Sequence, residues 1–392
     1  MTSVFQVAKN QLMLLQNGTA FFPQLCVDID AAQHFIYLET YIFAADETGR
    51  MVIDALQRAA VRGVRVHVLL DGYGSAELPP QWLDEFRAAK VEVQWYRREI
   101  SPFTFSRSRM RRLRRLHRKL AVMDGKVAFI GGFNIINDLS GDEDFSSPRL
   151  DYAVRVQGGV AEEIYAATRH LWGMVSWANF RRRGKEMGRV VSGRAKRTVV
   201  PAITLLLRDN LRHRRDIESA YLKAIGGAQR EIIIANAYFL PGRIFRRALK
   251  QAARRGVRVA LLLQGKVEYR LQHYATHALY DQLLAAGIEI YEYQASYLHA
   301  KVAVVDGLWA TVGSSNIDPF SLLLAREANL AVRDAGFAGE LRASLLATIA
   351  NDAIQVGDGK DVPRNWMGRV IARISYGIVR GLIGLLGYGR SL

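Results

Sequence analysis

The residues with the clearest capacity for chemistry in this chain of 392 residues form one motif that occurs twice. Each copy has the spacing His-x-Lys-x4-Asp and leads into a turn of small residues that ends in asparagine. The copies are His117, Lys119, Asp124 and Asn134 in the first half, and His299, Lys301, Asp306 and Asn316 in the second. One copy could arise by chance, but a repeat of this length predicts one shared site.

These residue types suit chemistry at phosphorus. An imidazole can attack or donate a proton near neutral pH, whereas a lysine ammonium and an asparagine amide can bind phosphate oxygens. One neutral and one protonated imidazole can coexist near the ordinary histidine pKa of about 6.5, so two histidines can supply both a nucleophile and an acid. The motif therefore predicts phosphoryl transfer.

The sequence around the motifs is duplicated as well, which matters because internal repeats reveal architecture. Residues 35–43 align with residues 232–240, and residues 60–70 align with residues 253–263. In each half an apolar run rich in β-branched residues leads to a helical pattern, a glycine and a second apolar run, which predicts a β-α-β unit. The expected fold class is α/β, with one such domain in each half.

Short strands are predicted after each histidine, at residues 119–123 and 127–130 in the first half and at 301–305 and 310–312 in the second. An Asp-Gly pair lies between the strands of each pair and predicts a tight turn. The motif aspartates are therefore expected to have a mainly structural role. The histidines should lie at strand starts and face a common cleft.

Length and composition fit two domains of ordinary size, since 50% of the residues are hydrophobic. Residues 180–198 are polar, contain glycine and lack apolar periodicity, which indicates a linker. We expect a first domain at residues 1–188, a second at 189–362, and an amphipathic membrane-associating tail at 363–392. The single cysteine excludes an intrachain disulfide and favours a reducing, cytoplasmic setting.

The net charge of +17 is concentrated near the first motif, where arginines from Arg107 to Arg115 lead into His117. Apolar residues interrupt this run, which suits a lipid interface better than a nucleic-acid backbone. In the tail at 363–392, arginines break any run long enough to span a bilayer and lie opposite apolar residues on a helical projection. The tail could insert at a membrane surface or pack on its own domain. Each Lys or Arg near an anionic bilayer contributes about 1 kcal/mol of attraction, so peripheral attachment is predicted.

The paired motifs resemble those of the phospholipase D superfamily. Within it, the flanking strings are similar to those of bacterial cardiolipin synthases of the B type, and the resemblance covers nearly the whole chain. The strings are Leu70 to Ser75, Ala235 to Phe239, Trp309 to Asn316, Asp318 to Ser321 and Glu327 to Asn329. The resemblance implies two α/β sandwich domains related by pseudo-twofold symmetry, with a single active site at their interface and no metal or other cofactor.

The resemblance also implies a two-step exchange at phosphorus. His117 is assigned as the nucleophile that forms a phosphohistidine and His299 as the acid and base, with the order left open by the pseudo-symmetry. The motif lysines and asparagines would bind the nonbridging oxygens. Glu327 would orient an imidazole, and Asp151 is its counterpart in the first half. The resemblance also places Asp124 and Asp306 among the catalytic residues of the active site. The first motif departs from the family pattern at Gly132, where the second motif has a serine hydroxyl.

For cardiolipin synthesis both donor and acceptor would be phosphatidylglycerol, and glycerol would be released. The expected partners are phosphatidylglycerol and the anionic surface of the bacterial cell membrane, on its cytoplasmic face; no oligomer is required, because the duplicated fold supplies both halves of the site. Another phosphatidyltransferase or hydrolase of the superfamily, a nuclease, and a nonenzymatic nucleic-acid-binding module remain alternatives. The arginine runs do not alternate with aromatic residues that could stack on bases, so no nucleic-acid partner is expected.

Overall fold

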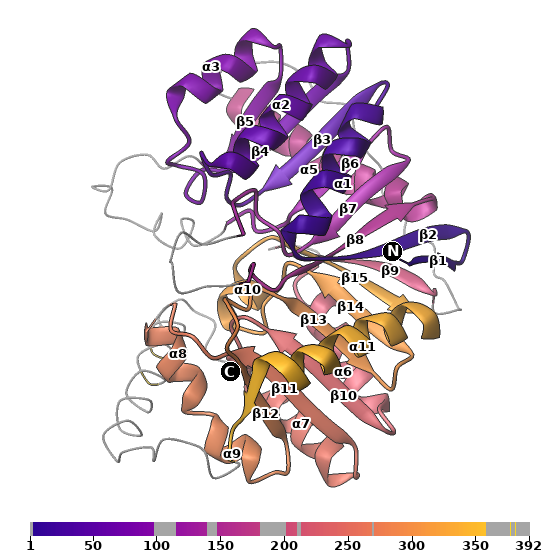
Figure 1. The fold of residues 1–392 in the computed structure, drawn as a ribbon, viewed down its shortest axis with the longest axis vertical. Helices are drawn as coiled ribbons and strands as arrows, with labels where there is room; N and C mark the ends of the chain where they lie inside the picture. The colour runs from indigo at the N-terminus through magenta and orange to yellow at the C-terminus, as the bar shows by residue number, and fades with distance from the viewer. Residues whose placement is uncertain are drawn as a thin grey trace. The chain divides into compact units, whose positions relative to one another are not determined.

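The computed structural model describes residues 3–97, 115–138, 147–180, 201–209, 213–268 and 270–357, together with Gly377 and Gly381. The chain forms two compact units. The first unit is Met1–Asn137 with Ala153–Leu205, and the second is Asp138–Tyr152 with Leu206–Leu392 (Figure 1). The domain boundary and linker expected near residue 189, most of the arginine run and nearly all of the tail lie outside the described residues, so they stay predictions.

The first unit contains an eight-stranded sheet in the order β1-β2-β8-β7-β6-β3-β4-β5. Its strands are β1 (Val4–Val7), β2 (Asn10–Gln16), β3 (Phe35–Thr40), β4 (Arg65–Asp71), β5 (Glu92–Tyr96), β6 (Leu120–Met123), β7 (Val127–Gly131) and β8 (Tyr152–Gln157). Its helices are α1 (Asn17–Ala31), α2 (Glu47–Val61), α3 (Pro80–Ala88) and α5 (Gly159–Phe180). Strands β3, β4 and β5 are parallel, whereas β6 and β7 are antiparallel to their neighbours.

Helices cover both faces of this sheet, because its central strands carry apolar side chains on both sides. On β3, Ile36 and Leu38 join the buried cluster formed with α1 and α2. The intervening residue Tyr37 points to the other face, where its ring meets Tyr165 and Trp172 of α5. The α/β/α layering thus follows from the alternation of side chains along the strand.

The second unit contains another eight-stranded sheet, in the order β16-β12-β11-β10-β13-β14-β15-β9. Its strands are β9 (Ile203–Arg208), β10 (Glu231–Asn236), β11 (Arg258–Gln264), β12 (Glu289–Tyr293), β13 (Lys301–Val305), β14 (Trp309–Gly313), β15 (Glu327–Arg333) and β16 (Ala353–Gln355). Its helices are α6 (Asp216–Gly227), α7 (Arg243–Arg254), α8 (Arg270–His277), α9 (Tyr280–Leu284), α10 (Pro319–Leu323) and α11 (Ala335–Asp352). Among the helices in the described ranges, none combines the length and the apolar content needed to cross a bilayer.

The predicted duplication of the α/β fold is confirmed by the strand order. The run β8-β7-β6-β3-β4-β5 in the first unit repeats as β15-β14-β13-β10-β11-β12 in the second. The short strands predicted after each histidine are β6 and β7 in one unit and β13 and β14 in the other. Each unit is therefore a complete copy of the scaffold that carries one motif.

The sequence alignment of the first strands was wrong by one residue. Opposite the motif strand, Glu39 pairs with Leu120 and Ala235 pairs with Val302. Because Leu120 and Val302 each follow the motif lysine, Phe35 corresponds to Glu231 and not to Ile232. Both strands are apolar on two faces and lack the alternation that would fix their register from sequence, whereas backbone pairing fixes it.

The two motif aspartates hold the turn after each motif strand to the start of the neighbouring strand. Asp124 accepts three backbone N–H bonds of 2.8 to 2.9 Å from residues 33–35, and Asp306 accepts three of the same lengths from residues 229–231. Both aspartates have positive φ, +55° and +54°, and the glycine after each also has positive φ, as a type I′ turn requires. Both aspartates therefore stabilise the turn through the same backbone contacts in each unit, in agreement with the structural role expected from the sequence.

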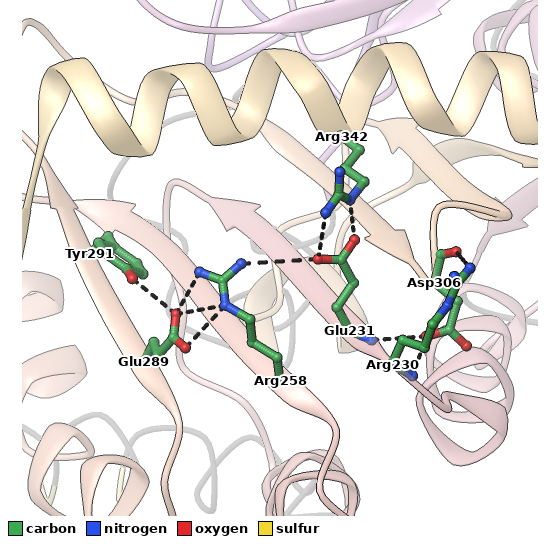
Figure 2. A network of polar contacts seen from close by, with 7 residues as sticks. All are labelled: Arg230, Glu231, Arg258, Glu289, Tyr291, Asp306 and Arg342. Atoms are coloured by element: carbon green, nitrogen blue, oxygen red, sulfur yellow. Dashed lines mark hydrogen bonds and ion pairs between the residues drawn. The ribbon is translucent and has the colours of Figure 1, made fainter.

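In the second unit this aspartate lies at one end of a chain of charged contacts (Figure 2). Glu231, whose backbone N–H binds Asp306, pairs through its side chain with Arg342 of α11. Arg258 lies 4.0 Å from the same carboxylate and forms a bond of 2.7 Å with Glu289. These ion pairs join the first residues of three parallel strands to the helix that covers them.

Replacing Asp306 by Ala should lower the free energy of unfolding by about 2–3 kcal/mol, because three N–H donors lose a charged acceptor and alanine disfavours positive φ. Asp306→Asn should cost less, since asparagine keeps one oxygen and tolerates this conformation. Burial opposes ionisation of Asp306, but the N–H donors outweigh it and lower its pKa. Its contribution is therefore present above the unfolded pKa of about 3.9 and is lost as the pH falls through the lower folded value. In urea unfolding, both variants should be less stable than the wild type at neutral pH, and the difference should shrink in acid. Equal stability of the wild type, Asp306→Ala and Asp306→Asn at neutral pH would contradict this account.

Candidate active site

The first motif lies just before β6, where its lysine and histidine contact one aromatic ring. The Lys119 Nζ donates to the backbone oxygen of His117 at 2.9 Å and lies 5.4 Å from the centroid of the Tyr41 ring. The imidazole of His117 meets the same ring with centroids 5.0 Å apart. The ring of Tyr41 therefore restricts both side chains that the sequence predicts to act on phosphorus.

A buried carboxylate fixes the backbone that leads into this motif. Asp71, at the end of β4, is fully buried and accepts the N–H of Leu116 at 2.8 Å, as well as those of Tyr73 and Gly74. Burial raises the pKa of Asp71, although these N–H groups act in the opposite direction. Leu116 immediately precedes His117, so Asp71 positions the histidine without being part of the motif.

The residue between histidine and lysine in the first motif is also held by a charge. Arg118 forms two hydrogen bonds with Glu39 of β3, at 2.7 and 2.8 Å, and both side chains are almost completely buried. The equivalent positions in the second unit are Ala300 and Ala235. Removing one partner of a buried pair typically costs about 3–5 kcal/mol, so this ion pair fixes β3 against the motif in the first unit only.

In the second motif, a carboxylate binds the imidazole directly. The Nδ1 of His299 lies 2.6 Å from Oδ2 of Asp151, while the other oxygen of Asp151 accepts the N–H of Tyr152 at 2.8 Å. The carboxylate is buried and the imidazole is 16% exposed. This contact fixes the ring and directs its other nitrogen, Nε2, away from the carboxylate, and it stabilises the imidazolium by Coulomb attraction.

The backbone explains how an aspartate 148 positions away reaches this histidine. The N–H of Leu150 donates to Tyr297 at 3.0 Å, and the N–H of His299 donates back to Leu150 at 2.9 Å. The Ser296 hydroxyl adds a bond of 2.7 Å to the carbonyl of Pro148. These bonds explain why residues 138–152 belong to the second compact unit. The sequence predicted Asp151 to be the first-half counterpart of Glu327, and the structure shows that Asp151 binds the imidazole of the second motif.

Lys301 is fully buried at the start of β13, where its Nζ donates to the backbone oxygen of His299. Burial lowers the pKa of this lysine to about 8, although the carboxylates of Asp151, Glu327 and Glu268 favour its charged form. Arg149 adds to the lowering by charge repulsion. Little water shields the charge of this buried ammonium, which suits the phosphate-binding role predicted for Lys301, although the three carboxylates oppose the approach of an anion.

Glu327, at the start of β15, is fully buried and accepts a bond of 2.5 Å from the hydroxyl of Ser314. The same hydroxyl accepts the N–H of Ala328 at 3.0 Å. Ser314 is itself fully buried, so its hydroxyl positions Glu327 and is not exposed to a substrate. The first motif has Gly132 at this place and cannot make an equivalent contact, which is the physical basis of the asymmetry seen in the sequence.

The motif asparagines follow β7 and β14 and are both buried. Asn134 accepts the N–H of Ile42 through its amide oxygen at 3.3 Å. With the oxygen used in this way, the amide NH₂ remains as a donor for a phosphate oxygen. Next to Asn316, the N–H of Ile317 donates to Asn236 at 3.1 Å, which fixes the turn that carries Asn316.

Sequence reasoning missed Arg149, Asp71 and Gln264. The guanidinium of Arg149 lies 5.4 Å from the Tyr297 ring, two residues before Asp151. Gln264 is equivalent to Asp71 in strand register, and its amide oxygen accepts the N–H of Leu298 at 2.6 Å. A comparison of the last residues of the β4 and β11 runs could have suggested the Asp71–Gln264 equivalence. In the ranges that the structure describes, no three His, Cys, Asp or Glu side chains are grouped as metal ligands would be.

The family model of the cardiolipin synthase, phospholipase D-like domain, matches residues 25–140 and 221–348, and each matched range contains one motif. This chain belongs to the cardiolipin synthase family of phospholipase D-like enzymes. It is 39% identical to cardiolipin synthase B of Escherichia coli K12, over 97% of this chain and 90% of that protein. It is 38% identical to cardiolipin synthase B of Salmonella typhimurium, over the same shares of the two chains.

One solved structure supports the two-domain α/β fold of this chain. The crystal structure of phosphatidylserine synthase from Haemophilus influenzae superposes with a TM-score of 0.68 and covers 96% of this chain and 95% of that one. Its sequence identity of 13% is low, so this likeness concerns the fold alone. The sequence matches therefore show the family and the enzyme class, and the superposition shows a shared fold.

Asp151→Asn should lower kcat for phosphatidyl transfer by about 10²- to 10⁴-fold, because the amide removes the charge that stabilises the imidazolium and allows the wrong tautomer of His299. KM should change little. The matched control is Asp28→Asn, which disrupts a part-buried ion pair with Arg155 (bonds of 2.5 and 2.7 Å) on the first unit. That control should lower the unfolding midpoint and leave kcat close to wild type; an Asp151→Asn enzyme with normal kcat would exclude the role given to this contact.

The lowered pKa of Lys301 predicts an alkaline limit to activity. The side chain is charged below its folded pKa of about 8 and becomes neutral as the pH rises through that value, so attraction for phosphate is lost. In the wild type, kcat/KM should fall about tenfold per pH unit above this point. Arginine stays charged to about pH 12 or above, so Lys301→Arg should keep a lower but flatter alkaline profile. A wild-type profile that is flat to about pH 10 would be the opposite result.

Proposed function

We propose that this enzyme makes cardiolipin by transferring a phosphatidyl group from one phosphatidylglycerol molecule to another, with release of glycerol. The observation that carries the proposal is the Asp151–His299 contact beside the buried ammonium of Lys301. It combines an oriented proton carrier with a fixed phosphate-binding charge, which is what exchange at a phosphodiester needs. Membership of the cardiolipin synthase family supports the choice of lipid substrates.

In the first step, an imidazole nitrogen of His117 forms a bond to phosphorus and the bond from phosphorus to the glycerol oxygen breaks. His299 gives its proton to that oxygen, so neutral glycerol leaves and a phosphatidyl-histidine remains. In the second step, a hydroxyl of the acceptor lipid gives its proton to His299 and bonds to phosphorus, and the phosphorus–nitrogen bond breaks. Protons and bonds balance over the cycle, and both histidines return to their starting forms.

The remaining motif residues stabilise charge on phosphorus in this scheme. The Lys119 and Lys301 ammonium groups and the NH₂ groups of Asn134 and Asn316 bind the nonbridging oxygens in the pentacoordinate transition state. Glu327, held by Ser314, favours the charged form of Lys301. Asp124 and Asp306 act through the backbone turns that they hold and do not contact the lipid.

We further propose that the enzyme works while attached peripherally to the cytoplasmic face of the bacterial cell membrane. The support is electrostatic: the formal net charge is +17, and anionic lipids attract each nearby basic side chain by about 1 kcal/mol. Phosphatidylglycerol is itself anionic, so the same field that holds the protein at the surface concentrates its substrate. A single chain carries both motifs, and the scheme does not need a second copy.

The test is product analysis with purified enzyme and vesicles of phosphatidylglycerol. Mass spectrometry should detect cardiolipin and an equal amount of glycerol, and both should form about 10³-fold more slowly with His117→Ala or His299→Ala. The matched control is His170→Ala, a histidine exposed on α5 outside the motifs, which should keep its rate. Phosphatidic acid as the sole product would assign a hydrolase instead, and cleavage of single-stranded DNA without lipid products would assign a nuclease.

A further inference from the structure

The two copies of the scaffold differ at one place close to the histidines. The strand registers make Tyr41 in the first unit equivalent to Ala237 in the second, since each directly follows the strand that pairs with the motif strand. In the first unit the ring of Tyr41 contacts His117 and also the turn after β4, where a Cβ added to Gly74 would lie 2.9 Å from ring atoms. In the second unit only a methyl group occupies this position.

The second unit has a hollow where the first has this ring. The hollow is small and partly open, with room for a group about the size of a water molecule or a hydroxyl. Ala237 and Leu263 provide apolar lining, while Gln264, Lys266, Glu268 and Gln272 provide polar lining. A small polar group therefore fits here better than an acyl chain.

Three contacts connect this hollow to the second motif. Gln264 holds the N–H of Leu298, next to the histidine, at 2.6 Å, and the N–H of Ala237 donates to Ala300 at 3.0 Å. The carboxylate of Glu268 is near enough to Lys301 to favour its charged form. The hollow thus borders the histidine–lysine segment of the second motif and is not a remote surface feature.

The polar groups of the hollow include both an acceptor and a donor. The carboxylate of Glu268 is oriented by the hydroxyl of Tyr238, which donates to one of its oxygens at 2.7 Å. The amide NH₂ of Gln264 is buried and has no hydrogen-bond partner within the described part of the chain. A hydroxyl both donates and accepts, so a bound hydroxyl can donate to this carboxylate or accept from this amide. Lys266 at the lining disfavours a cationic headgroup.

Exposed apolar side chains lie beside the polar lining. Val267 is 48% exposed, and Leu271 and Tyr274 of α8 are 42% and 37% exposed. They alternate in sequence with the lining residues Lys266, Glu268 and Gln272. A ligand with a polar headgroup and an apolar body can use both kinds of surface, as a phospholipid does.

We propose that the hollow lined by Ala237, Gln264 and Glu268 binds the free hydroxyl of a glycerol group, and that it makes the enzyme selective for glycerol-bearing alcohols. The assignment rests on the proposed function. The departing and the incoming alcohol occupy the same side of phosphorus, opposite the nucleophile, so one subsite serves the glycerol that leaves and the lipid-borne glycerol that attacks. Glu268 binds the hydroxyl next to the reacting one and thereby orients the reacting oxygen towards phosphorus and His299.

The experiment measures how the common phosphatidyl-enzyme divides between acceptors. Phosphatidylglycerol vesicles are supplied with ethanol and isotope-labelled glycerol at fixed concentrations, and cardiolipin, phosphatidylethanol and labelled phosphatidylglycerol are quantified by mass spectrometry. Each ratio to phosphatidylethanol depends on the acceptor step alone, because all three products arise from one intermediate. Ethanol has no second hydroxyl and serves as the internal reference.

The variants are Glu268→Gln, which removes the charged acceptor, and Tyr238→Phe, which removes the hydroxyl that orients it. Loss of a hydrogen bond to a charged group should lower the ratio of cardiolipin to phosphatidylethanol about tenfold or more in Glu268→Gln, and by a smaller factor in Tyr238→Phe. The matched control, Glu163→Gln on the exposed face of α5, should keep the wild-type ratio. Labelled phosphatidylglycerol should fall in parallel, because attack by free glycerol is the reverse of glycerol departure. A fall in cardiolipin alone would contradict a subsite shared by the leaving and the incoming glycerol.

Unchanged ratios in both variants, or equal losses of all three products, would overturn the assignment of the hollow while leaving phosphatidyl transfer in place. If the wild type transfers a phosphatidyl group to no acceptor, none of the three products forms. In that case the proposed function is wrong, and the glycerol subsite is wrong with it.

Discussion

The contact between Asp151 and His299 is the interaction on which the rest of the site depends. An imidazole can carry a proton to and from phosphorus only if its tautomer and ring orientation are fixed, and a carboxylate oxygen 2.6 Å from Nδ1 fixes both. The carboxylate in turn requires a rigid backbone, which the bonds between Leu150, Tyr297 and His299 provide. In the proposed mechanism, the position of residues 147–152 beside the second motif is therefore required for activity as well as for the fold.

Burial of charge is the second constraint. Lys301 is fully buried, which lowers its pKa, and three carboxylates offset part of that effect. Such an arrangement is unfavourable for folding in isolation but places an ammonium at a fixed point, where little reorganisation is needed when charge develops on phosphorus. Glu327 is another buried charged group held at a fixed point, because the buried hydroxyl of Ser314 donates a hydrogen bond to its carboxylate.

The duplicated scaffold keeps the backbone anchors and changes the side chains near the histidines. Each motif aspartate binds three N–H groups in both units, and Asp71 and Gln264 hold the residue before each histidine in the same way. In contrast, the buried pair Glu39–Arg118 becomes two alanines in the second unit, and the Tyr41 ring becomes the methyl group of Ala237. Anchors must be retained because each histidine needs them, whereas the neighbouring side chains are free to differentiate the two units.

The sequence by itself determined the duplication, the α/β class, the turns at the motif aspartates and the residue types that suit phosphoryl transfer. Each of these is local, since apolar periodicity, Asp-Gly pairs and motif spacing are properties of short segments. Tertiary structure decided the rest: the register of β3 and β10, the anchoring by Asp71 and Gln264, and the identity of the imidazole that Asp151 binds. Those features depend on backbone pairing between segments far apart in the chain, and strands that are apolar on both faces carry no pattern from which that pairing could be inferred.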